Sequence, residues 1–163
     1  MVKQVKTKAG RAAGRSRGDG PLARGVLDHL AGYHLRRAQI AVFQDFTAAI
    51  ASGADGPALT PGQFGVLALI QANPGLSQSA LGRAMGVDRS TVVGVIDKLE
   101  ARGLVRRAPH STDGRSYALG LSALGMRRFA EALKRVYRHE QRIASRLALR
   151  ERKLLLDLLR RIG

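Results

Sequence analysis

The stretch from Ser77 to Gly103 constrains the fold of this chain more than any other. It holds two helical patterns, QSALGRAMG and RSTVVGVIDKLEARG, and each follows a residue that can cap a helix N-terminus, Ser77 and Asp88. Gly86 separates the two patterns, and Gly103 ends the second, where glycine commonly follows a last helical turn. Two short helices joined by a few residues around a glycine predict a helix-turn-helix.

The apolar residues of this stretch fit the packing that such a motif requires. Gly82 is small at the position where the two helices would cross. On the second helix, Val92, Ile96 and Leu99 recur at spacings of four and three, so we expect them in the core and not in contact with a partner. The other apolar residues expected to pack within the motif are Leu81, Met85, Val87 and Val95.

A β-hairpin pattern follows the two helices directly. Its first strand begins near Val105, and its turn contains Asp113-Gly114. Its second strand alternates large and small residues with the period of a half-buried strand, the large ones being Tyr117, Leu119 and Leu121. A hairpin behind a helix-turn-helix is a winged helix-turn-helix, so we expect residues 57–122 to form a DNA-binding lobe.

Long helical patterns flank this lobe on both sides. Residues 26–51 show two apolar rows at helical spacing, and residues 123–163 show two more, with a break near residues 148–150. Thr60 before Pro61 predicts a capped helix over residues 61–72. The expected fold class is mainly α with a small β-wing, a single domain over residues 25–163 in which 25–56 and 123–163 are dimerisation helices.

The charge of the chain limits the classes of partner that it can be expected to bind. With 28 Lys and Arg against 12 Asp and Glu, the net charge is +16, which favours a polyanion, either nucleic acid or an anionic membrane surface. Residues 1–24 carry seven basic side chains and one acid, and we expect them to be a disordered basic tail. The tail is either a solvated extension or an arm that grips DNA. Without it the folded part still carries +10, and the winged motif favours double-stranded DNA.

Three parts of the lobe are expected to contact DNA. The second helix of the motif would present Arg89, the main candidate for reading a base, at its start. Arg115, behind the turn of the wing, would reach the minor groove, unless it contacts only solvent. The start of the preceding helix would hold phosphate through its free N–H groups. The other expected contacts are Ser77, Gln78, Ser90, Thr91, Lys98 and the pair Arg106 and Arg107, of which at most one faces phosphate while the other is solvated or paired.

Two segments resemble the MarR family of bacterial transcription regulators. DGRSYALGLSALG is similar to that family's wing, and DRSTVVGVIDKLEARGLVRR is similar to its recognition helix and the following strand. The resemblance covers about residues 25–163 and implies a homodimer that binds a palindromic operator, usually as a repressor released by a small ligand. Gly120 departs from the pattern, because a larger residue is more usual there, and we expect a softer wing. The leucine-rich last helix independently favours a two-fold partner.

The resemblance also implies an effector site between the dimerisation helices and the DNA-binding lobe. HLRRAQIAVFQDF looks similar to members that respond to aromatic carboxylates or their coenzyme A thioesters. The residues expected at this junction, which combine aromatic surface with cations, are Tyr33, His34, Arg36, Arg37, Phe43 and Phe64. Other roles stay open: Arg36 and Arg37 in an intersubunit salt bridge or on a solvated face, and Phe43 and Phe64 in the core.

Other classes of protein find less support. The absence of cysteine excludes disulfides and thiolate metal sites, so we expect a reducing, cytoplasmic setting. No apolar run approaches the roughly 20 residues of a membrane span. His29 and His34 fall on different helix faces, and His110 and His139 lack acidic neighbours at ligand spacing, which argues against a metal. No enzyme motif is found, and no cofactor is expected. The stronger rival is a sequence-tolerant architectural protein that coats DNA.

Overall fold

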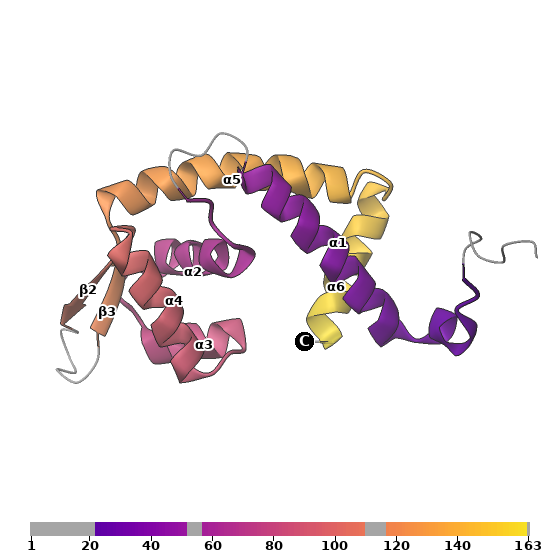
Figure 1. Ribbon diagram of the computed structural model, residues 1–163, viewed down its shortest axis with the longest axis horizontal. Coiled ribbons are helices and arrows are strands. Elements are labelled where there is room, and N and C mark those ends of the chain that lie inside the picture. The colour runs from indigo at the N-terminus through magenta and orange to yellow at the C-terminus, as the bar shows by residue number, and fades with distance from the viewer. Residues whose placement is uncertain (1–21, 52–56, 110–116, 163) are drawn as a thin grey trace, which may run out of the picture.

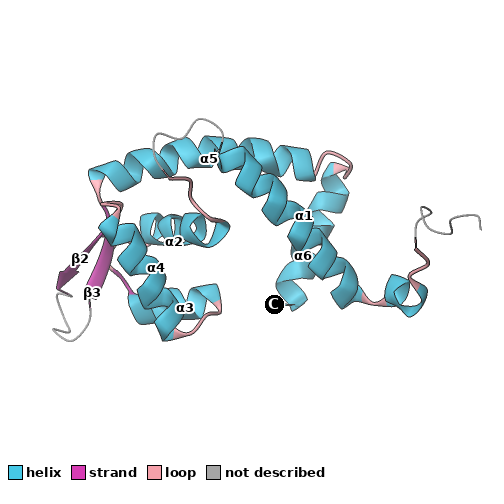
Figure 2. Cartoon of the chain, viewed as in Figure 1, coloured by secondary structure: helices cyan, strands magenta, loops and turns pink. Residues whose placement is uncertain are grey.

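Helices dominate the computed structural model, which describes residues 22–51, 57–109 and 117–162 (Figure 2). The mainly α fold class with a small β-wing is confirmed. The helices are α1 (Ala31–Ala51), α2 (Pro61–Ala72), α3 (Gln78–Met85), α4 (Arg89–Ala101), α5 (Ala123–Ile143) and α6 (Leu149–Ile162), and the strands are β1 (Leu76–Ser77), β2 (Val105–Pro109) and β3 (Tyr117–Leu121).

Side-chain caps fix where four of the helices begin. The hydroxyls of Thr60, Ser77 and Ser122 and the carboxylate of Asp88 each accept a hydrogen bond from the backbone N–H three residues further on, at 2.9–3.2 Å. Gln63 returns a bond to the Thr60 N–H and completes a capping box at α2. The caps predicted at residues 60, 77 and 88 are therefore confirmed.

The core of the lobe lies between α2, α3, α4 and the sheet. Val92, Ile96 and Leu99 are buried in it, as their spacing predicted. A Cβ at Gly82 would lie 3.2 Å from the Val92 side chain, so the two helices cross closely because this position is a glycine. The packing expected of Val87 is wrong, because that residue lies in the turn beyond α3 and is 38% exposed.

The small sheet joins the motif to the wing. Its order is β1-β3-β2 with both pairs antiparallel, and Val105 and Leu121 pair at one end while Pro109 and Tyr117 pair at the other. The sequence did not indicate β1, whose two residues are too few to show an alternating pattern. The turn of the wing, residues 110–116, lies outside the described residues.

Helix α5 carries the chain away from the lobe. Figure 1 shows it running from the wing end of the lobe to the region of α1 and α6, with α6 folding back beneath it. Its first turn lies directly against the lobe, since a Cβ at Gly125 would come within 1.9 Å of the Leu104 carbonyl oxygen. Along its second half α5 packs against α1. Among the described residues, no helix is long and apolar enough to cross a membrane.

Two helix boundaries differ from those predicted. The first pattern, expected as one helix over residues 26–51, contains a short 3-10 turn at Gly25–His29, an extended Leu30 and then α1, because His34 bonds back to the Asp28 carbonyl at 3.0 Å and fixes a bend. The break between α5 and α6 occupies residues 144–148, before the predicted 148–150. There the Glu151 carboxylate accepts from the Ala148 N–H at 2.7 Å and starts α6 earlier.

Candidate nucleic-acid interface

Helix α4 presents an exposed polar face opposite its buried one. Arg89, Ser90, Thr91 and Lys98 are all exposed. Ser90 and Lys98 lie on the side of α4 turned away from Val92, Ile96 and Leu99, because each residue advances about 100° around a helix. The structure therefore places Arg89, Ser90 and Thr91 in the first turn of α4 and Lys98 in its last turn.

The Asp88 carboxylate orders the start of α4. It accepts hydrogen bonds from the Ser90 hydroxyl at 2.5 Å, the Thr91 N–H at 2.9 Å and the Thr91 hydroxyl at 2.7 Å. The bond from Ser90, followed by those from Thr91, holds the pKa of Asp88 well below its usual range. Both hydroxyl hydrogens are thus occupied, and Ser90 and Thr91 are left with acceptor lone pairs, which suit the amino groups of bases better than phosphates.

Arg89 is a free cation beside this ordered turn. It makes no hydrogen bond or ion pair with any residue that the structure describes. It lines a surface hollow of about 400 Å³ between α3 and the start of α4, together with Gln78, Ser79, Gly82, Arg83, Gly86 and Val87. Arg83 is a second exposed cation on this hollow. Sequence reasoning missed it, although its position one turn before Gly86 was a usable signal.

The two arginines of β2 have different surroundings. Arg107 is largely buried and bonds to the carboxylates of Asp97, at 2.5 Å, and Glu100, both on α4. Burial lowers the pKa of Arg107, but the hydrogen bond to Asp97 and the charge of Glu100 outweigh it and raise that pKa overall. Arg106 is exposed and crosses the sheet over its partner Gly120, where a Cβ would meet the Arg106 side chain at 3.4 Å. Arg107 is therefore the paired member, and Arg106 is open to a ligand.

The remaining predicted DNA contacts are partly engaged or lie outside the described residues. The Ser77 hydroxyl oxygen caps α3, and the Gln78 amide lies beside Arg107, from whose Nε it accepts at 2.9 Å when its oxygen faces that side chain. Arg115 belongs to the wing turn, outside the described residues, as does most of the basic tail. Their roles stay predictions.

The six residues predicted for the effector site are not brought together within one protomer. Phe64 stacks on Phe129, with ring centroids 5.5 Å apart, and packs in the core of the lobe. On α1, the Arg37 guanidinium donates to the Tyr33 hydroxyl at 3.3 Å. His34 bonds to the bend before α1, and Arg36 and Phe43 are exposed. A single protomer therefore offers parts of the predicted site, spread along α1, while Phe64 of α2 meets α1 at Phe46, with ring centroids 6.0 Å apart.

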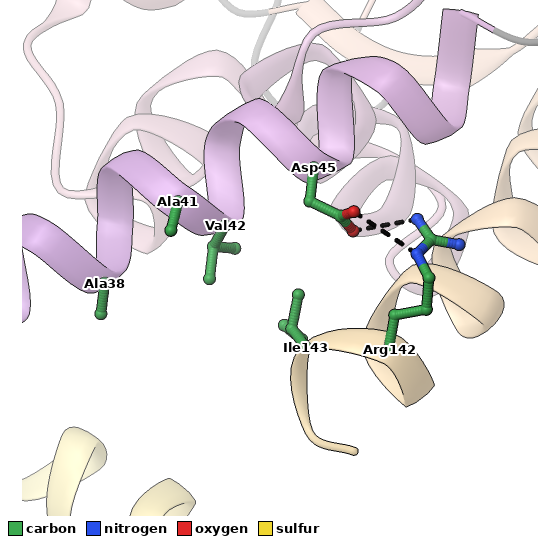
Figure 3. Close-up of a pocket in the computed structure, with 6 residues that line it drawn as sticks. All are labelled: Ala38, Ala41, Val42, Asp45, Arg142 and Ile143. Carbon is green, nitrogen blue, oxygen red and sulfur yellow. Dashed lines mark hydrogen bonds and ion pairs between the residues drawn. The ribbon is translucent and has the colours of Figure 1, made fainter. Parts of the chain in front are cut away.

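A cavity of about 410 Å³ lies between α1 and α5, at a different place (Figure 3). Its lining residues, none of them in the predicted effector set, are Ala38, Ala41, Val42, Asp45, Arg142 and Ile143. Figure 3 shows Asp45 and Arg142 facing each other across one end while the apolar side chains line the rest. The cavity opens beside the bend that joins α5 to α6.

Asp45 belongs to a network that sequence reasoning missed. The buried His139, 1% exposed, bonds through Nδ1 to the Asp45 carboxylate at 2.6 Å, and Arg142 donates to the same oxygen at 2.9 Å. The bond from Arg142, and then that from His139, lowers the pKa of Asp45. This network ties α1 to α5 across 94 residues of sequence, a separation over which no spacing rule operates. Among the described residues, no group of three His, Cys, Asp or Glu is placed to hold a metal.

Comparison with known proteins adds to this geometry. The family model described as "MarR family" matches residues 59–116. A Thauera aromatica protein, named as a transcriptional regulator for the hcr operon, is 43% identical over 141 residues, which cover 86% of this chain and 83% of that protein. The similarity therefore extends over most of the length of both proteins.

Two solved structures of the transcriptional repressor CouR superpose well. The one bound to a 23-mer DNA duplex gives a TM-score of 0.80 at 40% identity and covers 88% of this chain and 99% of that one. The one bound to p-coumaroyl-CoA gives 0.77 at 40% identity, with 87% and 97% covered. The likeness extends over the lobe and the flanking helices alike.

Proposed function

The chain belongs to the MarR family of transcription regulators, and from that premise we propose that it is a ligand-responsive repressor that binds a palindromic operator as a homodimer. The observation that carries the proposal is the start of α4. There Asp88 orders Ser90 and Thr91, and Arg89 lies beside them without an ion pair to any described residue. A preordered helix start with one free guanidinium suits base reading in a major groove.

The remaining DNA contacts follow from this placement. With α4 in the major groove, Lys98, Arg106 and the start of α3 at Ser77 and Gln78 would contact phosphates, which set register and affinity. Arg115 would enter the minor groove from the wing. We assign Arg107 to holding the wing, because its charge is already paired with Asp97 and Glu100.

The homodimer is proposed from the apolar surface that one protomer leaves open. On α6, Leu154, Leu155, Leu158, Leu159 and Ile162 are each at least 40% exposed. On α1, Ile40 and Phe43 are similarly exposed. An apolar surface of this extent on helices outside the lobe is typical of a subunit interface. Two-fold symmetry would then place two α4 helices in successive major grooves, about 10 bp apart.

We propose an aromatic carboxylate or its coenzyme A thioester as the effector. A relative of the same fold and 40% identity has been solved with p-coumaroyl-CoA, and α1 carries both aromatic and cationic side chains. Because one protomer does not unite Tyr33, His34, Arg36, Arg37, Phe43 and Phe64, the proposed site includes the partner's lobe. In it, Arg36 and Arg37 would bind the anionic group of the ligand.

A gel shift on the promoter fragment beside the gene, with excess random competitor DNA, tests the proposal. The wild-type protein should give a shift that survives the competitor and that one aromatic acid or thioester abolishes. Arg89→Ala should relax preference at one base position by about 1–3 kcal/mol, while Arg36→Ala or Arg37→Ala should keep the shift and lose its release by ligand.

The same assay separates the rival function. An architectural protein that coats DNA would bind promoter and random fragments alike, and Arg89→Ala would weaken both equally. That outcome would contradict both the proposed operator and the proposed effector site. If both α1 variants keep a specific shift and are still released from DNA by the ligand, only the assignment of the effector residues is contradicted.

A further inference from the structure

The face of α5 that points away from the lobe is a row of charged side chains. α5 packs Phe129, Ala132, Val136 and His139 against the lobe and α1. About half a helical turn round from these residues lie four exposed positions. We call them the outer face of α5: Arg127, Glu131, Lys134 and Arg138.

Little on the described chain neutralises the three cations of the outer face. Arg127 and Lys134 form no ion pair or hydrogen bond through their side chains with any described residue, and Arg138 donates only to the Lys134 carbonyl at 3.5 Å. Glu131 supplies the single carboxylate of this face. The outer face therefore holds a net positive charge in direct contact with solvent.

The flank of the same helix adds to that charge. Arg128 donates to the Pro57 carbonyl, a neutral acceptor that leaves its guanidinium charge in place. Arg142 is compensated by Asp45. On this flank, Arg128 thus adds one positive charge beside the start of the outer face.

This charge cannot serve the DNA that α4 reads. α5 lies across the far side of the lobe core from α3 (Figure 1), and the outer face is turned away from that core. We propose that the outer face of α5 binds the phosphate backbone of a second DNA duplex, so that a dimer on its operator holds two DNA segments together. The inference rests on the proposed function, because it requires α4 to occupy the first duplex.

The spacing of the cations fits a duplex. At 1.5 Å rise per residue, Arg127 and Lys134 lie about 10 Å apart along the helix axis, and Lys134 and Arg138 about 6 Å. DNA carries one negative charge per roughly 1.7 Å of its axis, so a straight row of this length meets several phosphates. A membrane-surface helix would instead need apolar side chains among the cations, to insert into the lipid. None of the four outer-face residues is apolar. The exposed apolar side chains Met126 and Tyr137 lie to one side of this row and not among its cations, which favours the duplex.

A two-duplex capture assay tests the inference. A biotinylated promoter duplex is immobilised, loaded with full-length protein and washed, and a fluorescent random-sequence duplex is then added. The test variant is Arg127→Gln/Lys134→Gln/Arg138→Gln. Its matched control, Arg150→Gln/Lys153→Gln/Arg160→Gln, removes three exposed cations from α6. Thermal unfolding followed by circular dichroism establishes that both variants fold.

We expect the wild type and the α6 control to retain the second duplex. The outer-face variant should load the first duplex as the wild type does and retain the second about tenfold less, because three phosphate contacts are gone. Equal retention by the outer-face variant, or no retention by a wild type that has loaded, would overturn the inference and leave the proposed function intact.

Other results separate the two proposals further. A wild type that fails to load the first duplex contradicts the proposed function, and this inference with it. If the second duplex is not retained but vesicles of phosphatidylglycerol and phosphatidylcholine, or a single-stranded RNA, are retained and the outer-face variant loses them, the partner is not DNA and the inference is wrong.

Discussion

Asp88 links the stability of α4 to the order of its first turn, which is the proposed base-reading end. The same carboxylate caps the helix through the Thr91 N–H and holds the hydroxyls of Ser90 and Thr91. These hydrogen bonds favour the charged form, so the pKa of Asp88 lies below the value near 3.9 of an unfolded chain. A group with a lowered pKa stabilises the fold above its unfolded pKa, and that stabilisation is lost as the pH falls through its folded pKa.

We predict a pH-dependent loss of stability in Asp88→Ala. At pH 7 the variant should unfold at a lower denaturant concentration than the wild type, because both the cap and the charge are lost. The difference should narrow as the pH falls below about 4, because the Asp88 carboxylate of the unfolded wild-type chain begins to be protonated there while that of the folded protein stays charged. Urea unfolding followed by circular dichroism at several pH values measures this gap.

Thr60→Ala provides the control for that prediction. Thr60 caps α2 with a hydroxyl that does not titrate, so its removal should cost about 1 kcal/mol at every pH in the series. Asp88→Asn should keep much of the cap, since asparagine caps about as well as aspartate, and lose the pH dependence. A gap for Asp88→Ala that stays constant down to pH 2 would show that its charge contributes nothing.

At the scale of elements, Arg107 ties the wing to α4. It reaches from β2 to Asp97 and Glu100 near the end of α4, so the angle between the wing and the recognition helix depends on these ion pairs. The side chain of Arg107 is 19% exposed and those of the two acids 56% and 39%. Solvent screening therefore limits how much each pair contributes to stability.

We predict that Arg107→Ala and Glu100→Ala are coupled. A double-mutant cycle of unfolding free energies should give an interaction of about 0.5–1 kcal/mol, the range of partly exposed pairs. Arg107→Ala should weaken binding to operator and random DNA by the same factor, because it loosens the wing without removing a base contact. Gel shifts on both duplexes measure that factor.

Arg106→Ala is the matched variant on the same strand. Because Arg106 is exposed, the unfolding free energy of the Arg106→Ala protein should differ from that of the wild type by less than about 0.5 kcal/mol. The salt dependence of its DNA binding should fall by about one phosphate contact. If instead Arg107→Ala reduces the salt dependence and shows no coupling to Glu100, then Arg107 faces the phosphates and the assignment of the two arginines must be exchanged.

The elements that the sequence predicted are those set by local chemistry. Thr60, Ser77 and Asp88 were found as caps, and Val92, Ile96 and Leu99 as core, because capping and helical spacing act within a few residues. Features that depend on distant partners were not predicted. The two-residue strand β1 exists because it pairs with β3, Leu76 opposite Leu119, and His139 is buried against α1, where it contacts Asp45 and Phe46.

In the candidate site, too, the features set by local sequence were predicted and those that depend on distant residues were not. Sequence reasoning placed Arg89 at the exposed start of α4, and its role in reading a base stays a prediction. It left open which of Arg106 and Arg107 is paired, because a strand alternates its side chains but does not say which face meets α4. It also grouped residues of α1 with Phe64 of α2, whose ring lies against Phe46 of α1 in one protomer, with ring centroids 6.0 Å apart. In the proposed dimer a partner would complete that grouping, and no single chain contains the position of a partner.

At the scale of the whole molecule, the two ends of one protomer differ in how far their apolar side chains are buried. The lobe has a closed core, in which Leu67, Ile96 and Leu99 are fully buried. The far end consists of α1, the second half of α5 and α6, and the described residues give α6 no buried side chain at all. An amphipathic helix with its apolar face uncovered is unfavourable in water. The proposed dimer would resolve this by covering the apolar face of α6 with the same face of a partner.

We predict that Leu158→Glu separates the dimer. Leu158 lies in the middle of the apolar face of α6 and is 41% exposed in the protomer. A carboxylate buried without a partner at an interface is costly, and a penalty of about 3 kcal/mol would raise the dimer dissociation constant roughly a hundredfold. Sedimentation velocity at micromolar concentration should show a monomer, while circular dichroism shows retained helices.

The DNA-binding consequence of that variant separates dimerisation from folding. A monomer contacts one half-site, so its affinity for the full operator should fall steeply, and the salt dependence of its binding should be about half that of the wild type. Lys153→Glu, on the opposite side of α6, should remain a dimer and keep the wild-type salt dependence to within about one contact. A Leu158→Glu protein that stays dimeric would place the subunit interface elsewhere, and the geometry of two recognition helices about 10 bp apart would lose its support.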